Sequence, residues 1–337
     1  MKNVLFATTA LVAMTGSAFA ASHGGMSGTT VAFSGAMTAG YNDVIEGGMF
    51  YDADLDLTAT VDFGDSVVAT LTTQVANGDE TGGTFVFTPT VDIAYTGGSY
   101  SASLRVGDMN DKGASEYFYK DRSGMAIDVE NQDNGTHARA LVEFGNFGVA
   151  VGCDLTGSNA CTGMNVGAGA TFGSIKLGVG YDSAATTGGA RTGVSADATF
   201  GSFDVGASYI TDNTNNSIGV KVGTTFGAAK VGAYYAMNSA AADEFGVSVD
   251  YTSGAMTVGA YYDNNGASTF GVDVGYAVSD SLKASVGVKS GGSTDYYAGI
   301  VYDVNSNISA TVSYATADAI SGPEFKDGIT AMITAKF

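Results

Sequence analysis

Several residue types on which most binding and catalytic sites depend are scarce in this sequence. Its 337 residues include no tryptophan, two cysteines, two histidines and two prolines, and 14 basic residues stand against 34 acidic ones. The formal net charge of −20 repels nucleic acid and attracts cations, so nucleic-acid binding is excluded as a function. No segment approaches the roughly 18 consecutive apolar residues that a membrane-spanning helix requires.

Residues 1–20 have the organisation of a signal peptide. Lys2 gives a basic start, Val4–Met14 is an apolar run too short to span a bilayer, and Ala18–Ala20 has the small residues that precede cleavage. Cleavage after Ala20 leaves residues 21–337 as a single exported domain.

The scarce cysteines and histidines are placed for structure rather than for chemistry. Cys153 and Cys161 are eight positions apart, and in an oxidising compartment this spacing favours a local disulfide. His23 and His137 lie far from them in sequence, so a metal or redox site lacks ligands. The sequence has no Gly-x-Ser-x-Gly motif, and we expect no enzymatic activity; an aspartate–histidine site is the alternative.

Apolar and small residues alternate with a period of two along the chain. Residues 175–181 place Ile, Leu, Val and Tyr on one face, and Lys176 and two glycines on the other. A soluble sandwich would need bulkier residues in its core, whereas a membrane barrel has lipid outside and water inside. The pattern therefore predicts transmembrane strands, and it recurs in residues 203–209, 218–226, 245–251, 270–276 and 282–288.

Short turns divide these strands at regular intervals. From residue 146 onward they fall about 26–28 residues apart, which is one hairpin plus a longer loop, so the sequence predicts an antiparallel up-and-down meander. The nine turns predict about twenty strands, two per turn plus two. They lie at Phe-Gly sequences in 63–65, 144–146, 172–174, 200–202 and 226–228, and near residues 97–98, 253–254, 279–280 and 305–306.

Aromatic residues divide between the two ends of the predicted strands. Phenylalanines precede the short turns and tyrosines end strands that enter longer loops, which predicts aromatic girdles at both lipid–water interfaces. The alternating segment 329–337 ends on an outward Phe337. If it pairs with the first strand, residues 31–41, the sheet closes without an exposed edge.

Taken together, these features resemble the general diffusion porins of Gram-negative bacteria, and most closely their alphaproteobacterial, Rhodobacter-like branch. The resemblance rests on the opening strand Val31–Gly35, the Phe-Gly turns, Arg105–Asp108 and the terminal Phe337. It implies an all-β transmembrane barrel in the outer membrane, a homotrimer, a water-filled lumen and a third loop that folds inward as a constriction. It also implies sixteen strands, against the twenty that the turns predict, so we expect 16–20.

The constriction loop predicted by this resemblance is the segment of about residues 108–136, where the alternation fails. Its acidic excess predicts a preference for cations, because a charged constriction hinders like-charged solutes. Asp108 and Asp111 are candidate ligands of a structural Ca²⁺ ion. The charged residues of the segment are Asp108, Asp111, Lys112, Glu116, Lys120, Asp121, Arg122, Asp128, Glu130 and Asp133.

In porins of this kind, the wall opposite the constriction usually carries basic side chains. The candidates at inward-facing positions are Arg105, Arg139, Lys176, Lys221, Lys230 and Lys283; the alternative is that each is a solvated surface charge.

The sequence therefore predicts passive diffusion of small hydrophilic solutes and ions across a bacterial outer membrane. It predicts no cofactor other than the possible Ca²⁺ ion. Two alternatives stay open: a solute-specific channel, to which Tyr117, Tyr234 and Tyr261 could contribute, and a non-conducting structural barrel.

Overall fold

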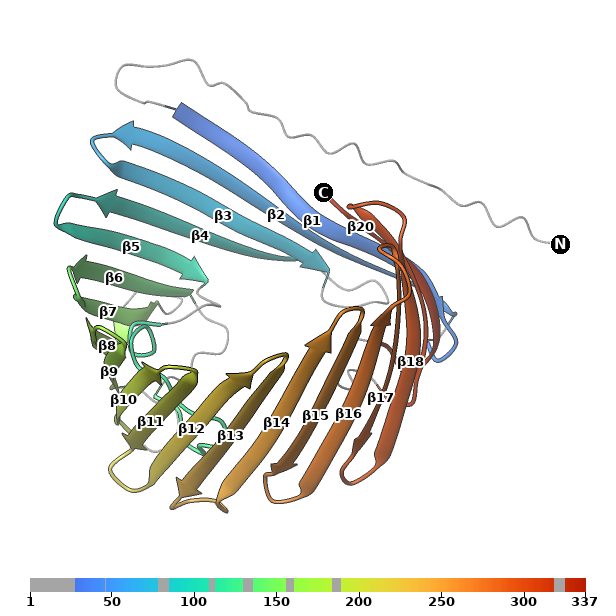
Figure 1. The fold of residues 1–337 in the computed structure, drawn as a ribbon. Coiled ribbons are helices and arrows are strands. Elements are labelled where there is room, and N and C mark those ends of the chain that lie inside the picture. Colours follow the sequence, from blue (N-terminus) through green and yellow to red (C-terminus); the bar gives the residue numbers. More distant parts are fainter. Residues whose placement is uncertain are drawn as a thin grey trace.

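The computed structural model describes residues 28–45, 47–77, 85–108, 113–129, 136–155, 161–183, 189–317 and 325–337, and the predicted signal peptide lies outside them. All regular secondary structure in these residues belongs to one 20-stranded antiparallel sheet (Figure 1). The described part of the chain contains no helix that could cross a membrane.

The strands follow one another along the chain as an up-and-down meander. They are β1 (Gly28–Asn42), β2 (Met49–Gly64), β3 (Val67–Asn77), β4 (Phe85–Thr96), β5 (Tyr100–Asp108), β6 (Thr136–Phe144), β7 (Phe147–Leu155), β8 (Cys161–Phe172), β9 (Ile175–Asp182), β10 (Arg191–Phe200), β11 (Phe203–Thr211), β12 (Asn216–Phe226), β13 (Ala229–Asn238), β14 (Glu244–Ser253), β15 (Met256–Asn264), β16 (Ser268–Ala277), β17 (Leu282–Ser290), β18 (Thr294–Asp303), β19 (Ile308–Ala315) and β20 (Gly328–Lys336).

The sheet closes on itself. Each strand pairs with its chain neighbours, and β1 pairs with β20 from Ala36 opposite Lys336 to Asn42 opposite Thr330. The terminal Phe337 extends this seam, since its backbone exchanges hydrogen bonds of 3.0 and 3.1 Å with Gly35. Closure leaves no unpaired edge, which is a requirement for a sheet in lipid.

The strand number of twenty predicted from the turns is confirmed, and the sixteen strands implied by the family resemblance are wrong for this chain. The turn count succeeds because short turns are local features of the sequence, with glycine at positions of positive φ. Gly145, Gly173, Gly201, Gly227 and Gly254 have φ values of 57 to 63°, which other residues rarely adopt.

Alternate residues of each strand point outward, and the outward set is apolar. On β9, Leu177 and Val179 are exposed, while Gly178 and Gly180, which alternate with them, are buried. Exposed large apolar side chains are expected where the surrounding solvent is lipid. The aromatic residues of the two ends are also exposed: Phe63, Phe144, Phe172, Phe200 and Phe226 beside short turns, and Tyr41, Tyr181, Tyr209, Tyr235 and Tyr314 at the opposite ends.

Candidate functional site

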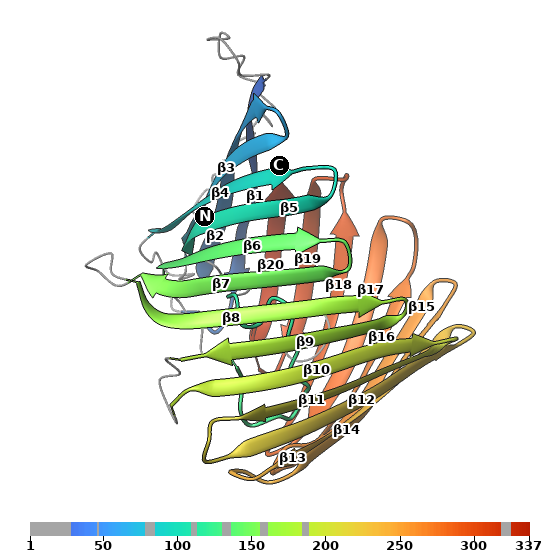
Figure 2. The ribbon, with the colours of Figure 1, turned by 90° about the vertical axis from the view of Figure 1, so that its left-hand side faces the viewer.

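One segment of the chain, residues 113–129, lies inside the barrel against the inner wall. Figure 1 shows it within the ring of strands, and Figure 2 shows it behind the wall that β6–β13 form. Its apolar side chains Tyr119, Ile127 and Val129 are buried and form a cluster with Ile210 of β11. One side of the segment is therefore packed against the wall like a core element.

Inward glycines make room for the main chain of this segment. A Cβ added at Gly167 would lie 2.0 Å from the carbonyl oxygen of Ala114, and one at Gly178 would lie 2.1 Å from that of Phe118. A Cβ added at Gly180 would lie 2.5 Å from the carbonyl oxygen of Ser115. The sequence predicted that small inward residues contact water, but at these positions they contact protein.

Polar side chains of the wall hold the backbone of the segment at several points along its length. Each pairs with a main-chain amide or carbonyl of the segment. Asn165 accepts from the Ala114 amide (3.2 Å), Ser195 accepts from the Lys120 amide (3.1 Å), Ser208 donates to the Lys120 carbonyl (2.5 Å), and Asn238 donates to the Gly124 carbonyl (2.8 Å) and accepts from the Ala126 amide (2.9 Å).

Charged groups anchor the same segment. The buried guanidinium of Arg122 donates to a carboxylate oxygen of Asp197 on β10 at 2.9 Å, and Lys221 of β12 lies 3.3 Å from the other oxygen of that carboxylate. Arg191 donates to the carbonyl of Asp128 at 2.6 Å. Arg122 thus belongs to the wall contact and does not project into the lumen.

Tyr119 is a buried anchor of the segment. Its phenol is almost fully enclosed, and this burial raises the pKa of Tyr119 well above its ordinary value, with Asp121 and Asp128 adding to the increase. A tyrosine is neutral at physiological pH even without this shift, so the ring packs as an uncharged group in the cluster with Ile127, Val129 and Ile210.

The structure brings together five of the predicted constriction residues in this segment, namely Glu116, Lys120, Asp121, Arg122 and Asp128. Lys120 and Asp121 are exposed. Asp108 ends β5, whereas Asp111, Lys112, Glu130 and Asp133 lie outside the described residues. The Ca²⁺ site at Asp108 and Asp111 therefore stays a prediction.

The predicted wall bases occupy inward positions, but four of them do not face the segment from the opposite side. The wall that carries the segment holds Arg139 on β6, Lys176 on β9, Lys221 on β12 and Lys230 on β13. Arg139 stacks on Tyr117 with its guanidinium carbon 4.9 Å from the ring centroid. The five wall bases other than Arg139 each lie beside an acid. Arg105 forms an ion pair with Asp92 at 3.1 Å and Lys283 one with Asp303 at 3.0 Å, and Lys221 pairs with Asp197 as described above. Lys176 and Lys230 lie directly opposite Asp197 and Asp250 on the neighbouring strands.

Acidic residues of the inner wall were missed by the sequence analysis, which considered acids only in the loop. Asp52, Asp54 and Asp56 occupy successive inward positions of β2, because the outward face there carries Tyr51. Strand alternation applied to acids would have found them. Glu244, Asp250, Asp263 and Asp273 are placed in the same way on β14–β16. Arg191 and Lys326 are inward bases that were also missed.

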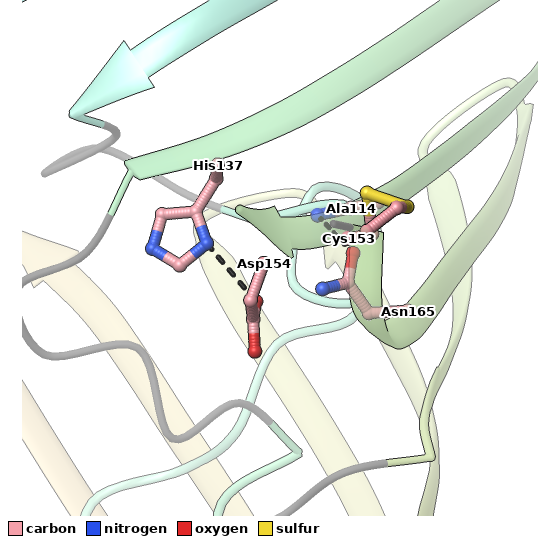
Figure 3. The surroundings of a disulfide bond; sticks show 6 residues. Ala114, His137, Cys153, Asp154 and Asn165 are labelled. Atoms are coloured by element: carbon pink, nitrogen blue, oxygen red, sulfur yellow. Dashed lines mark hydrogen bonds and ion pairs between the residues drawn. A yellow bond between two sulfur atoms is a disulfide. The ribbon is translucent and has the colours of Figure 1, made fainter. Parts of the chain in front are cut away.

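The two cysteines form a disulfide at the loop end of the β7–β8 hairpin. Cys153 and Cys161 have an S–S distance of 2.03 Å and a Cα–Cα distance of 5.5 Å. Figure 3 shows His137 and Asp154 near it, pointing toward each other from neighbouring strands with Nδ1 and Oδ1 3.0 Å apart. Asn165, which holds Ala114, lies in the same region, so the disulfide stabilises the wall near the first anchor of the segment.

A closed barrel with an apolar outer face, a charged inner face and an inward segment is the architecture of an outer-membrane channel. The sequence matches the Gram-negative porin family over residues 7–320, and the chain belongs to that family. It is accordingly an integral protein of the outer membrane.

Similar solved structures include several mutants of the porin of Rhodopseudomonas blastica. Three of them have 15%, 16% and 17% sequence identity and TM-scores of 0.45, 0.46 and 0.45. Each alignment covers 91% of this chain and 100% of the other. No curated protein matches the sequence.

Proposed function

We propose that the chain forms a water-filled pore for passive diffusion of small hydrophilic solutes and ions, with a preference for cations and with residues 113–129 as its constriction. The observation that carries this proposal is the distribution of charge inside the barrel. Five of the six predicted wall bases lie beside an acid, while β2 and β14–β16 add further inward carboxylates. The resulting negative potential attracts cations and hinders anions.

General diffusion is favoured over a solute-specific channel by the tyrosines of the wall. Tyr234 and Tyr261 lie against glycines on the neighbouring strands, and Tyr117 lies under Arg139. Their rings are thus engaged with the wall and do not form a continuous track for one solute.

The assembly that we propose is a homotrimer in outer-membrane lipid, with the disulfide as a structural staple and with Ca²⁺ at Asp108 and Asp111 as the one candidate ion. We assign no enzymatic activity. A hydrolytic site would need a nucleophile beside His137, and the part of the chain that the structure describes places no hydroxyl or free thiol in hydrogen-bond contact with this imidazole.

The test is single-channel current of the mature protein in a planar bilayer, with the reversal potential measured across a KCl gradient. We expect conductance steps and a cation-selective potential. Replacing residues 114–128 by a short Gly/Ser linker should enlarge the steps about twofold, because the constriction is removed. The triple change Asp52→Asn, Asp54→Asn and Asp56→Asn serves as the charge control, and it should reduce selectivity while leaving the step size nearly unchanged.

A silent bilayer, obtained with protein whose gel migration is heat-modifiable and which is therefore folded, would contradict the proposal. It would favour the non-conducting structural barrel instead.

A further inference from the structure

A second part of the chain lies inside the barrel, at Phe325–Asp327 just before β20. Phe325 is 3% exposed and packs edge-on against Tyr297 of β18, with ring centroids 5.4 Å apart. A Cβ added at Gly299 would lie 2.2 Å from the Phe325 ring. Tyr297 and Gly299 point inward, because Tyr296 and Ile300 on the same strand are exposed on the outer face.

The position of these residues is built by the strands at the barrel seam. Asn42, 1% exposed at the end of β1, donates from its side-chain nitrogen to the carbonyl of Asp327 at 2.7 Å and to the hydroxyl of Thr330 at 2.8 Å. Gly328 then turns the chain into β20 with a φ of +83°, a conformation that other residues rarely adopt. The placement therefore depends on a buried apolar contact, a buried amide and a required glycine.

Lys326, between the anchored residues Phe325 and Asp327, lies at the loop end of a column of acidic side chains on the inner face of β2. Its ammonium nitrogen is 5.1 Å from the centroid of the Phe50 ring at the start of β2, and Asp52, Asp54 and Asp56 follow at the next inward positions of that strand. Burial lowers the pKa of Lys326, and the negative charge of Asp52 opposes this shift. The lysine thus stands where a cation would approach the acidic column from the loop end.

The two inward segments are attached to opposite walls. Residues 113–129 contact strands from β6 to β14, whereas Phe325–Asp327 contacts β18, β19, β1 and β2. In a closed ring of 20 strands, β8 and β18 are ten strands apart, so they lie across the lumen from one another (Figure 1).

We propose that Phe325–Asp327 is a second constriction element and that Lys326 is a selectivity-determining residue, whose charge weakens the attraction of cations to the acidic column of β2. This inference rests on the proposed diffusion function. It assigns a constricting role to residues beside the β1–β20 pairing, whereas the sequence predicted this role only for the long loop.

The narrowing is tested by Phe325→Ala, which removes the buried ring from the inside of the barrel. We expect its single-channel conductance to rise by about half, because the lumen widens on that side. Phe226→Ala is the matched control, since this phenylalanine is exposed on the outer face of the barrel. Equal conductance of Phe325→Ala and wild type would overturn the second constriction, and heat-modifiable migration of both variants verifies that they are folded.

The charge role is tested by Lys326→Gln, with Lys230→Gln as a control that removes one inward base beside the short turn after β12. We expect the cation-to-anion permeability ratio to rise about twofold for Lys326→Gln and much less for the control. Equal shifts in both variants would show that only the total charge matters and would overturn the assignment. A wild-type protein that conducts without cation preference, or not at all, would instead refute the proposed function.

Discussion

The wall from β7 to β12 and the wall from β13 to β18 are both rich in inward glycine, but for different reasons. On the first, the glycines admit residues 113–129: Gly167, Gly178 and Gly180 face its main chain, and others face its side chains. On the second, they admit tyrosine rings from the strand alongside, directly opposite in register. These pairs are Tyr234 with Gly246, Tyr261 with Gly271 and Tyr297 with Gly287, in which an added Cβ would lie 2.4, 2.2 and 2.3 Å from the ring.

The difference decides what an added methyl group would do. Against a backbone carbonyl, the strand or the whole segment must move, whereas a tyrosine ring can turn about its own side-chain bonds. Inward glycines therefore have two structural roles: on one wall they make space for the constriction segment, and on the other they make space for tyrosine rings of the wall itself.

The largest effect is expected from Gly167→Ala combined with Gly178→Ala. Both methyl groups meet backbone oxygens of the segment, so residues 113–129 should be pushed from the wall toward the lumen. We expect the free energy of unfolding to fall by about 1–3 kcal/mol per site, as in overpacked cores, and single-channel conductance to fall because the pore narrows. Unfolding in denaturant and bilayer recordings measure the two effects. A double variant with wild-type conductance would show that the position of the segment does not depend on its contacts with these glycines.

A smaller effect is expected from Arg122→Ala, which removes the buried ionic anchor of the same segment. The loss of charge-assisted hydrogen bonds to Asp197 and to the Ala196 carbonyl should destabilise the barrel by about 1–3 kcal/mol and increase current noise. Lys221→Ala is the matched comparison, because this lysine is largely exposed and its pair with Asp197 should contribute less than about 1 kcal/mol. Equal losses of stability in the two variants would refute the anchoring role of Arg122.

The smallest effect is expected on the open wall, from Gly271→Ala. The Tyr261 ring can rotate away from the new methyl group, so we expect a loss below about 1 kcal/mol and no change in conductance. A loss as large as that caused by Gly178→Ala would remove the distinction between the walls. The same denaturant titration and current recordings serve for both variants.

Much of the barrel was predictable because its signals are local. The Phe-Gly turns, the alternation of residues 175–181 and the aromatic ends each depend on neighbours in the chain, and all three appear in the structure. The candidate site was less predictable. The acids of the loop were recognised, but Asp52, Arg191 and Lys326 were not, because their relevance depends on which strands and segments meet inside the closed ring.

By itself the sequence determined the positions of the short turns, the lipid-facing side of the strands and the acidic character of the protein, since period-two alternation and turn chemistry act over a few residues. It left the strand number between 16 and 20, and the structure decided it at twenty. Only the tertiary structure decided what the inward glycines accommodate, that Arg122 is directed into the wall, and that Phe325 lies across the lumen from residues 113–129. These relations join residues that are distant in the chain, and they exist only once β1 and β20 have closed the barrel.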